Sequence, residues 1–241
     1  MLYSSDPDTL LGAARTVFNF SLGPDEYVSE IIKADFVGLL VVLLADKTDS
    51  VQMSCLRALR NIAFKHRQVV IESGALLQFH NLLRSPLTSI QEECCLVIAI
   101  ITDGTPAQIE AVIEANLFPD VISLLRSDDQ EARKEAAWAI CNATSHPDPQ
   151  HVKYLVAQGC LKPLCDMLSS QDPETLEITL DSIDSILSVG QEEVRNGSSL
   201  KNEYLIMLED LNAINSIVSL QNHAIEDVFS KSKDIVEKYL L

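Results

Sequence analysis

The sequence is poor in the residues that β-rich folds need. Aromatic residues make up only 5% of the 241 residues, and there are 8 glycines and 9 prolines. A β-sandwich or β-barrel needs aromatic and β-branched strands that are interrupted often by turn residues. Hydrophobic residues nevertheless make up 47% of the chain, which is too many for a disordered protein. The composition therefore favours a folded, helical protein.

Positive charge is also scarce. The chain has 18 lysines and arginines against 35 aspartates and glutamates, which gives a formal net charge of −17 at pH 7. A protein that binds nucleic acid neutralises phosphates with basic side chains, and an anionic membrane surface makes the same demand. We therefore expect no nucleic-acid partner and no membrane partner. A negative surface attracts cations, so a basic ligand is the natural partner.

None of the six cysteines forms a Cys-x-x-Cys pair, and most of them lie in apolar runs. This pattern predicts free, buried thiols, which are typical of a reducing compartment. The sequence also lacks an uninterrupted apolar stretch that could span a bilayer, and its first residues do not read as a charged-then-apolar leader. We expect a soluble, intracellular protein.

Recognisable catalytic and ligand-binding motifs are missing as well. The sequence has no Gly-x-Ser-x-Gly, no His-Glu-x-x-His and no glycine-rich phosphate loop. His146 and His151 could be imagined as metal ligands, but no third ligand is patterned nearby, and we interpret their segment as a solvated loop. We expect no enzymatic activity, no cofactor and no metal site.

What the sequence does contain is an internal repeat. Five similar apolar helices end near residues 19, 61, 100, 142 and 186, which are 42, 39, 42 and 44 residues apart. A second apolar helix follows each of the first four, and an all-helical period of about 40–47 residues is typical of armadillo and HEAT repeats. The predicted fold is therefore all-α, a right-handed α-solenoid of about five armadillo repeats with a concave groove. Within one domain over residues 1–241, the repeats are expected near residues 6–46, 47–86, 87–127, 128–170 and 171–220, with a terminal helix over residues 222–241.

The first predicted repeat has the apolar pattern of a middle repeat. Leu10, Leu11, Ala13, Val17 and Phe18 leave no polar face that would suit the end of a solenoid, and such ends need polar caps. We therefore expect either upstream repeats or a partner that covers this end.

Helical angles indicate which side chains share a groove-facing surface. Positions i−3, i and i+4 lie on one face, and in the fourth repeat these are Glu135, Trp138 and Asn142. As a peptide clamp, Asn142 would bind the peptide backbone, Trp138 would carry the stem of a Lys or Arg, and Glu135 would take its charge. The alternative is that this single Trp belongs to the core, and periodicity alone does not decide between the two.

Three stretches carry a resemblance to a known family. They are AQIEAVIEANLFP (Ala107–Pro119), RKEAAWAICNAT (Arg133–Thr144) and YLVAQGCLKPLCD (Tyr154–Asp166). With these stretches, residues 68–241 resemble the last armadillo repeats of importin alpha (karyopherin alpha), and residues 1–67 resemble the two preceding repeats more loosely. The resemblance implies a nuclear import adaptor that binds basic nuclear-localisation-signal peptides in an acidic groove. It also places the family's major signal-binding site and autoinhibitory segment upstream of this chain.

The resemblance further implies which residues line the groove, because each groove helix of the family presents a Trp and, four residues on, an Asn. This chain keeps the pair only as Trp138 and Asn142. At the equivalent positions the first repeat has Arg15 and Asn19, the second Arg57 and Asn61, and the third Leu96 and Ile100. The implied peptide-binding residues are Trp138, Asn142, Glu135, Glu93, Arg57, Asn61 and Asn19.

In the family, a minor signal-binding site holds a basic side chain between Trp residues of adjacent repeats. These departures predict that this minor site is degraded in the present chain. Leu96 in place of an indole gives up a cation–π contact of ~0.5–2 kcal/mol, and Ile100 removes a backbone clamp of ~0.5–1.5 kcal/mol. The alternative function is an armadillo scaffold in which Leu96 and Ile100 form an apolar pocket for a different protein or peptide partner. Salt dependence distinguishes the two, because only a basic peptide should bind much more weakly as the ionic strength rises.

By the same resemblance, the carboxy-terminal repeats would dock the export receptor and a nucleoporin, and the protein would reside in the cytoplasm and the nucleus. An acidic run near the end of the chain is the candidate surface for this second contact, although such runs are usually solvated. Its members are Glu192, Glu193, Glu203, Glu209 and Asp210.

Overall fold

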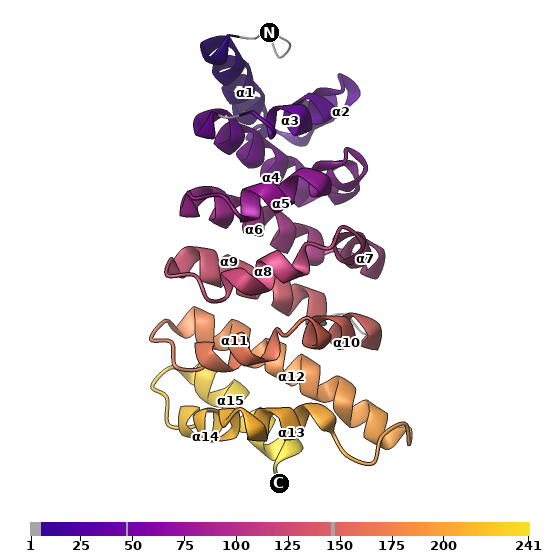
Figure 1. The fold of residues 1–241 in the computed structure, drawn as a ribbon, viewed down its shortest axis with the longest axis vertical. Coiled ribbons are helices and arrows are strands. Elements are labelled where there is room, and N and C mark those ends of the chain that lie inside the picture. Colours follow the sequence, from indigo (N-terminus) through magenta and orange to yellow (C-terminus); the bar gives the residue numbers. More distant parts are fainter. Residues whose placement is uncertain (1–5, 47, 146–147) are drawn as a thin grey trace. The chain divides into compact units, whose positions relative to one another are not determined.

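The structure is a computed structural model that describes residues 6–46, 48–145 and 148–241. These ranges contain fifteen α-helices and no β-strand, so the predicted all-α class is confirmed (Figure 1). The helices form two compact units, and the division falls between residues 139 and 140, inside helix α9 (Gln130–Ser145). No helix in the described ranges is both long and apolar enough to cross a membrane.

The first unit is built from long helices that stack on one another, with pairs of shorter helices beside them. Helix α1 packs on α4, and α4 packs on α6 (Figure 1). Helix α4 contains a break at His66, so its last turns form a short helix of their own. Besides the start of α9, the unit comprises α1 (Pro7–Ser21), α2 (Asp25–Lys33), α3 (Phe36–Leu43), α4 (Asp49–Glu72), α5 (Ala75–Leu83), α6 (Thr88–Thr102), α7 (Pro106–Glu114) and α8 (Phe118–Leu124).

The second unit continues the same alternation and ends on a helix that covers α12. The last helix, α15, packs on both α12 and α14. Its Tyr239 hydroxyl donates to Asp184 Oδ1 at 2.7 Å, and the Lys231 ammonium lies 2.5 Å from Asp181 Oδ1. After the end of α9, the unit comprises α10 (Pro149–Ala157), α11 (Leu161–Met167), α12 (Pro173–Arg195), α13 (Glu203–Asp210), α14 (Ala213–Leu220) and α15 (Glu226–Tyr239).

A left-handed backbone conformation recurs at the turn between the two short helices of each repeat. Asp35, Gly74, Asn116, Gly159 and Asn212 all have positive φ, between 55° and 87°. Glycine adopts this conformation at no steric cost, and Asn and Asp tolerate it better than other residues. The first four positions are 39, 42 and 43 residues apart, because 74 − 35 = 39, 116 − 74 = 42 and 159 − 116 = 43. The turn is therefore a second marker of the repeat, independent of the apolar pattern.

Asp-Pro pairs fix the starts of several helices. The carboxylate of Asp6 accepts from the Thr9 amide at 2.9 Å, and that of Asp172 accepts from the Thr175 amide at 3.0 Å. Asp148 caps α10 in the same way through the Gln150 amide. In each case proline follows directly, where its missing N–H leaves no hydrogen bond unmade. The scarce prolines thus stand largely where they begin helices.

Apolar side chains from both kinds of helix fill the core. Phe79 and Phe118 are among the largest fully buried side chains. All six cysteines are buried and free, as predicted, and burial raises the pKa of the Cys55, Cys160 and Cys165 thiols to about 12. These thiols therefore pack as small apolar groups.

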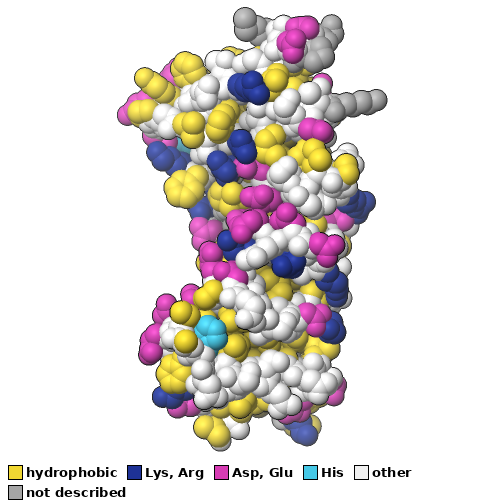
Figure 2. All heavy atoms as spheres, turned by 90° about the vertical axis from the view of Figure 1, so that its left-hand side faces the viewer, with side chains coloured by type: hydrophobic (Ala, Val, Ile, Leu, Met, Phe, Trp, Pro, Cys, Tyr) yellow, Lys and Arg dark blue, Asp and Glu magenta, His cyan; other side chains and the backbone are white. Residues whose placement is uncertain are grey.

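Several exposed apolar side chains lie on or next to the first three helices. Phe20, Leu22, Tyr27, Phe36 and Val42 are each between 37% and 69% exposed. In Figure 2, yellow side chains gather at the surface near the level of these helices. A cavity of about 520 Å³ lies among them, and its lining includes Phe20, Tyr27 and Phe36.

A candidate peptide-binding groove

The residues that were expected to bind a peptide lie on the long helices. Asn19 lies on α1, Arg57 and Asn61 on α4, and Glu93 on α6. These helices and the start of α9 follow one another along the first unit in Figure 1. One face of successive long helices therefore carries the predicted positions.

Helix α9 carries the remaining three residues, Glu135, Trp138 and Asn142. Their spacing places them on one face of the helix, and all three side chains are half-buried. Trp138 is not among the buried core residues, so part of its indole ring is accessible to a ligand. An accessible aromatic face is what a cation–π contact requires.

Negative charge gathers where α6 and α9 approach each other. Burial and the neighbouring carboxylates of Glu93, Asp129 and Glu131 raise the pKa of Glu92 above its usual range. Burial is the largest cause of the raised pKa, and the three neighbouring carboxylates add a negative electrostatic potential at Glu92. A cationic side chain of a ligand would be attracted to this part of the groove.

Glu93 itself already has internal partners. Its side chain is only 8% exposed, and Oε1 lies 2.8 Å from Arg60 Nη1 while Oε2 lies 3.5 Å from Arg57 Nε. Burial raises the pKa of this carboxyl, and the two guanidinium groups lower it by less than burial raises it. The resemblance implied that Glu93 binds a peptide, but in the structure its carboxylate pairs with two arginines of α4. Arg60 follows Arg57 by three residues and so lies on the same face of α4.

Asn61 also has an internal partner. Its side-chain nitrogen donates to Ser21 Oγ at 2.9 Å, and Ser21 Oγ donates to the Phe18 carbonyl at 2.6 Å. The amide therefore ties α4 to the end of α1. One N–H and the carbonyl oxygen of the Asn61 amide lie outside this bond.

Between α1 and α4 the groove has a different character. A cavity of about 340 Å³ lies between these helices, and the residues that line it include Arg15 and Arg57. Arg15 and Asn19 are exposed, as is Arg57 despite its contact with Glu93. The full lining comprises Arg15, Phe18, Asn19, Ser50, Met53, Ser54 and Arg57.

An ionic cluster around the largely buried Asp120 joins the short helices α5 and α8 and was not foreseen. Asp120 Oδ2 lies 2.8 Å from His80 Nδ1, and Asp120 Oδ1 accepts from Arg84 Nε at 2.8 Å. His80 Nε2 lies 2.9 Å from the Ala115 carbonyl. The partners are 36 and 40 residues apart, about one repeat, and they hold neighbouring repeats together.

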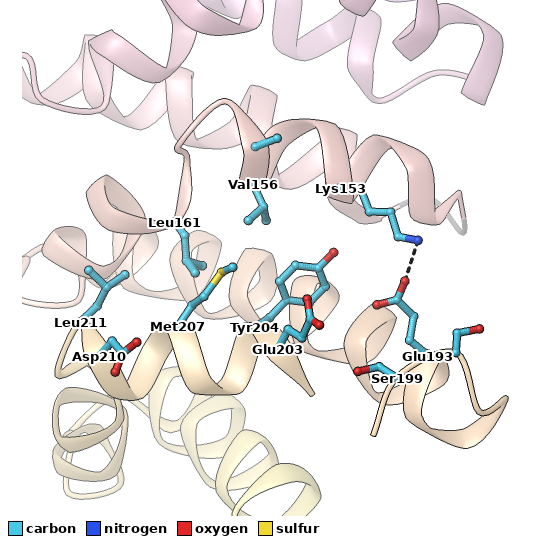
Figure 3. Close-up of a pocket in the computed structure, with 12 residues that line it drawn as sticks. Lys153, Val156, Leu161, Glu193, Ser199, Glu203, Tyr204, Met207, Asp210 and Leu211 are labelled. Atoms are coloured by element: carbon cyan, nitrogen blue, oxygen red, sulfur yellow. Dashed lines mark ion pairs between the residues drawn. The ribbon is translucent and has the colours of Figure 1, made fainter. Parts of the chain in front are cut away.

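A second cavity, of about 660 Å³, lies in the second unit among α10, α11, α13 and the end of α12 (Figure 3). Val156, Leu161 and Met207 give it an apolar wall, and Glu193, Glu203 and Asp210 add carboxylates. One of these is paired, because Lys153 Nζ lies 2.6 Å from Glu193 Oε1. Three members of the acidic run noted in the sequence therefore line a single cavity.

Nothing in the described part of the chain groups three potential metal ligands together. Of the two histidines considered above, His146 lies outside the described residues, and His151 is buried at the start of α10.

Known proteins match the chain in both sequence and fold. The armadillo/beta-catenin-like repeat matches residues 24–64, 105–145 and 148–183. Importin subunit alpha-4 of Arabidopsis thaliana is 35% identical over 99% of this chain and 45% of its own length. Importin subunit alpha-1b of Oryza sativa subsp. japonica is 36% identical over 100% of this chain and 46% of its own. The chain thus spans about half the length of these relatives.

Solved structures agree with the sequence matches. A designed armadillo repeat protein in complex with the peptide (KR)4 superposes with a TM-score of 0.86 at 29% identity, covering 99% of this chain and 96% of the design. A second designed armadillo repeat protein has a TM-score of 0.85 at 27% identity and covers 98% of this chain and 95% of the design. The predicted armadillo solenoid class is confirmed. The chain is an armadillo-repeat protein of the importin alpha family, and it corresponds to the carboxy-terminal half of the subunits that it matches.

Proposed function

We propose that this chain is a transport-adaptor module that binds an extended basic peptide of the nuclear-localisation-signal type. The observation that carries the proposal is the half-buried indole of Trp138 on one helical face with Glu135 and Asn142. The ring would hold the stem and charge of a Lys or Arg, with Glu135 nearby as counter-charge. Asn142 would hydrogen-bond the peptide backbone.

Electrostatics support this ligand. The net charge of −17 attracts cationic peptides over long distances, and the carboxylates of Glu92, Asp129 and Glu131 lie near one another at the start of α9. The fold has a precedent as well, because a designed armadillo protein with a TM-score of 0.86 to this chain was solved with the basic peptide (KR)4.

We expect this chain to bind a basic peptide more weakly than a family member with the complete Trp and Asn pattern would. Leu96 supplies no second indole, Ile100 supplies no second amide, and Glu93 is already paired with Arg60. A single cation–π contact contributes ~0.5–2 kcal/mol, which is at most about a thirtyfold effect on affinity. The expected site is therefore a degraded minor site centred on α9.

Fluorescence anisotropy of a labelled bipartite basic peptide tests the proposal. We expect Trp138→Ala to abolish binding and the control Leu77→Ala to leave it unchanged, since Leu77 is 71% exposed and lies on the short helix α5. Binding should weaken steeply between low and physiological salt. Unchanged affinity in Trp138→Ala would refute the site.

The second candidate function is a scaffold for a different protein or peptide. The pairing of Glu93 with Arg57 and Arg60 favours it, because that pairing removes an acidic group from the groove. Binding of an apolar segment over Leu96 and Ile100 would show little salt dependence, in contrast to binding of a basic peptide.

The cavity of Figure 3 is our candidate for a carboxy-terminal partner. By resemblance that partner would be the export receptor or a nucleoporin, and the protein would move between cytoplasm and nucleus. The apolar wall of Val156, Leu161 and Met207 beside Glu203 and Asp210 suits a segment with apolar and basic side chains. Met207→Glu should weaken capture of such a partner without changing the Trp138 site.

A further inference from the structure

The cavity between α1 and α4 has the wrong charge for a basic peptide. Its two basic residues, Arg15 and Arg57, come from neighbouring helices and both line a space of about 340 Å³. Arg15 makes no ion pair within the described ranges, and its side chain is exposed. Arg57 shares the carboxylate of Glu93 with Arg60 and also interacts electrostatically with Glu92. Arg15 therefore supplies the excess positive charge at this cavity, in a chain whose net charge is −17.

The other lining residues suit an acidic side chain. Asn19 and Ser50 add an amide and a hydroxyl group that can donate hydrogen bonds, and Met53 and Phe18 can contact the methylene groups of a bound side chain. Guanidinium groups bind carboxylates in a planar, two-bond geometry, and two of them on opposite walls select an anion over a neutral group.

We propose that this cavity, lined by Arg15, Asn19 and Arg57, binds the carboxylate of a Glu or Asp in the same extended peptide whose basic side chain lies at Trp138. The inference rests on the proposed function for the basic half of that peptide. The groove then carries opposite charges at its two ends: Arg15 and Arg57 lie between α1 and α4, and the carboxylates of Glu92, Asp129 and Glu131 lie near one another between α6 and α9. A ligand of matching polarity gains affinity at both ends, and a uniformly basic one is repelled at one of them.

The order of the helices gives the spacing of the two charges. The cavity lies between α1 and α4, and α6 separates α4 from α9 in the first unit (Figure 1). Packed helices lie roughly 8–10 Å apart, so the cavity is about two and a half spacings, or roughly 20–25 Å, from α9. An extended peptide advances about 3.3 Å per residue. The acidic residue is thus expected about six to eight positions from the basic one.

The test uses four labelled peptides. Two carry a basic cluster, and in the other two Ser and Gln replace that cluster. Within each pair, one peptide has Glu and the other has Gln about seven residues from the cluster. Wild-type protein should bind the basic peptide with Glu about two- to fivefold more tightly than the one with Gln, the range for an exposed ion pair. Arg15→Gln should remove this preference. The matched control Arg126→Gln should keep it, since Arg126 is exposed and lies outside the cavity.

The outcomes separate this inference from the proposed function. Equal affinity for the Glu and Gln peptides in the wild type, with binding still lost in Trp138→Ala, overturns the acidic pocket and keeps the basic site. The peptide with Glu and no basic cluster probes the pocket alone, through the side-chain NMR resonances of Arg15. If this peptide shifts the Arg15 resonances while basic peptides do not bind, the acidic-residue pocket is supported and the proposed function fails. If no peptide binds or shifts a resonance, both fail.

Discussion

Arg60→Met isolates the contribution of one guanidinium group to a buried carboxylate. Arg60 Nη1 lies 2.8 Å from Glu93 Oε1, and the Arg60 side chain is 29% exposed while that of Glu93 is 8% exposed. Breaking a fully buried pair costs ~3–5 kcal/mol, and an exposed pair contributes at most ~1 kcal/mol. With one partner buried and one partly exposed, we expect a loss of about 2 kcal/mol at neutral pH. Methionine keeps most of the apolar stem of Arg60, which limits the loss of packing.

Glu93→Gln should behave in the opposite way. The pKa of Glu93 is raised in the folded state because burial outweighs the attraction of both arginines. The native protein therefore binds the proton more tightly than the unfolded chain does, and this group destabilises the fold as pH rises above the ordinary pKa of a glutamate. A neutral isostere removes that penalty. We expect Glu93→Gln to be neutral or stabilising at neutral pH.

Urea unfolding at pH ~7.5 and pH ~5.5 measures both variants and their combination. The loss in Arg60→Met should shrink at the lower pH, because protonation of Glu93 removes the unpaired charge. The double variant should recover most of the loss at the higher pH, since no buried charge remains. The reasoning is refuted if Glu93→Gln costs as much as Arg60→Met, or if the loss in Arg60→Met does not depend on pH.

Three further predictions concern stability and reactivity. Asp120→Asn should destabilise the protein by about 1.5–3 kcal/mol in urea unfolding, because His80 and Arg84 lose a charged acceptor; a change below 0.5 kcal/mol would contradict the cluster. Asp172→Ala should cost about 1 kcal/mol by removing the cap of α12, and Asp172→Asn should recover most of it. The Cys55 and Cys160 thiols, with pKa values of about 12, should react with a thiol reagent at pH ~7.5 only as fast as the protein unfolds, and rapid labelling of the folded protein would contradict their burial.

The repeat and its helices were predictable because they depend on local patterns. Apolar periodicity and a spacing of about 40 residues were enough to identify stacked helices. The left-handed turns at Asp35, Gly74 and Asn116 recur with the same period. They could not be recognised from the sequence, because Asp and Asn occur in many other conformations as well. The buried cysteines followed from their apolar surroundings.

The internal pairing in the groove was not predictable to the same extent. Spacing placed Asn61 and Glu93 on the groove face, but their partners Ser21 and Arg60 lie about one repeat away, at 40 and 33 residues along the chain. Whether such side chains meet depends on the rotation between neighbouring repeats, which no local pattern encodes. The two arginines at the cavity between α1 and α4 were visible as replacements of a Trp, but their convergence depends on the same rotation.

The emission of Trp138 tests the central claim most directly, because it is the single tryptophan of the chain. A basic peptide without tryptophan, titrated at low and at physiological salt, reports contact with this indole and no other. We expect a saturable change in emission whose affinity falls as salt rises. Binding that is detected by anisotropy but leaves the emission unchanged would contradict the site on α9.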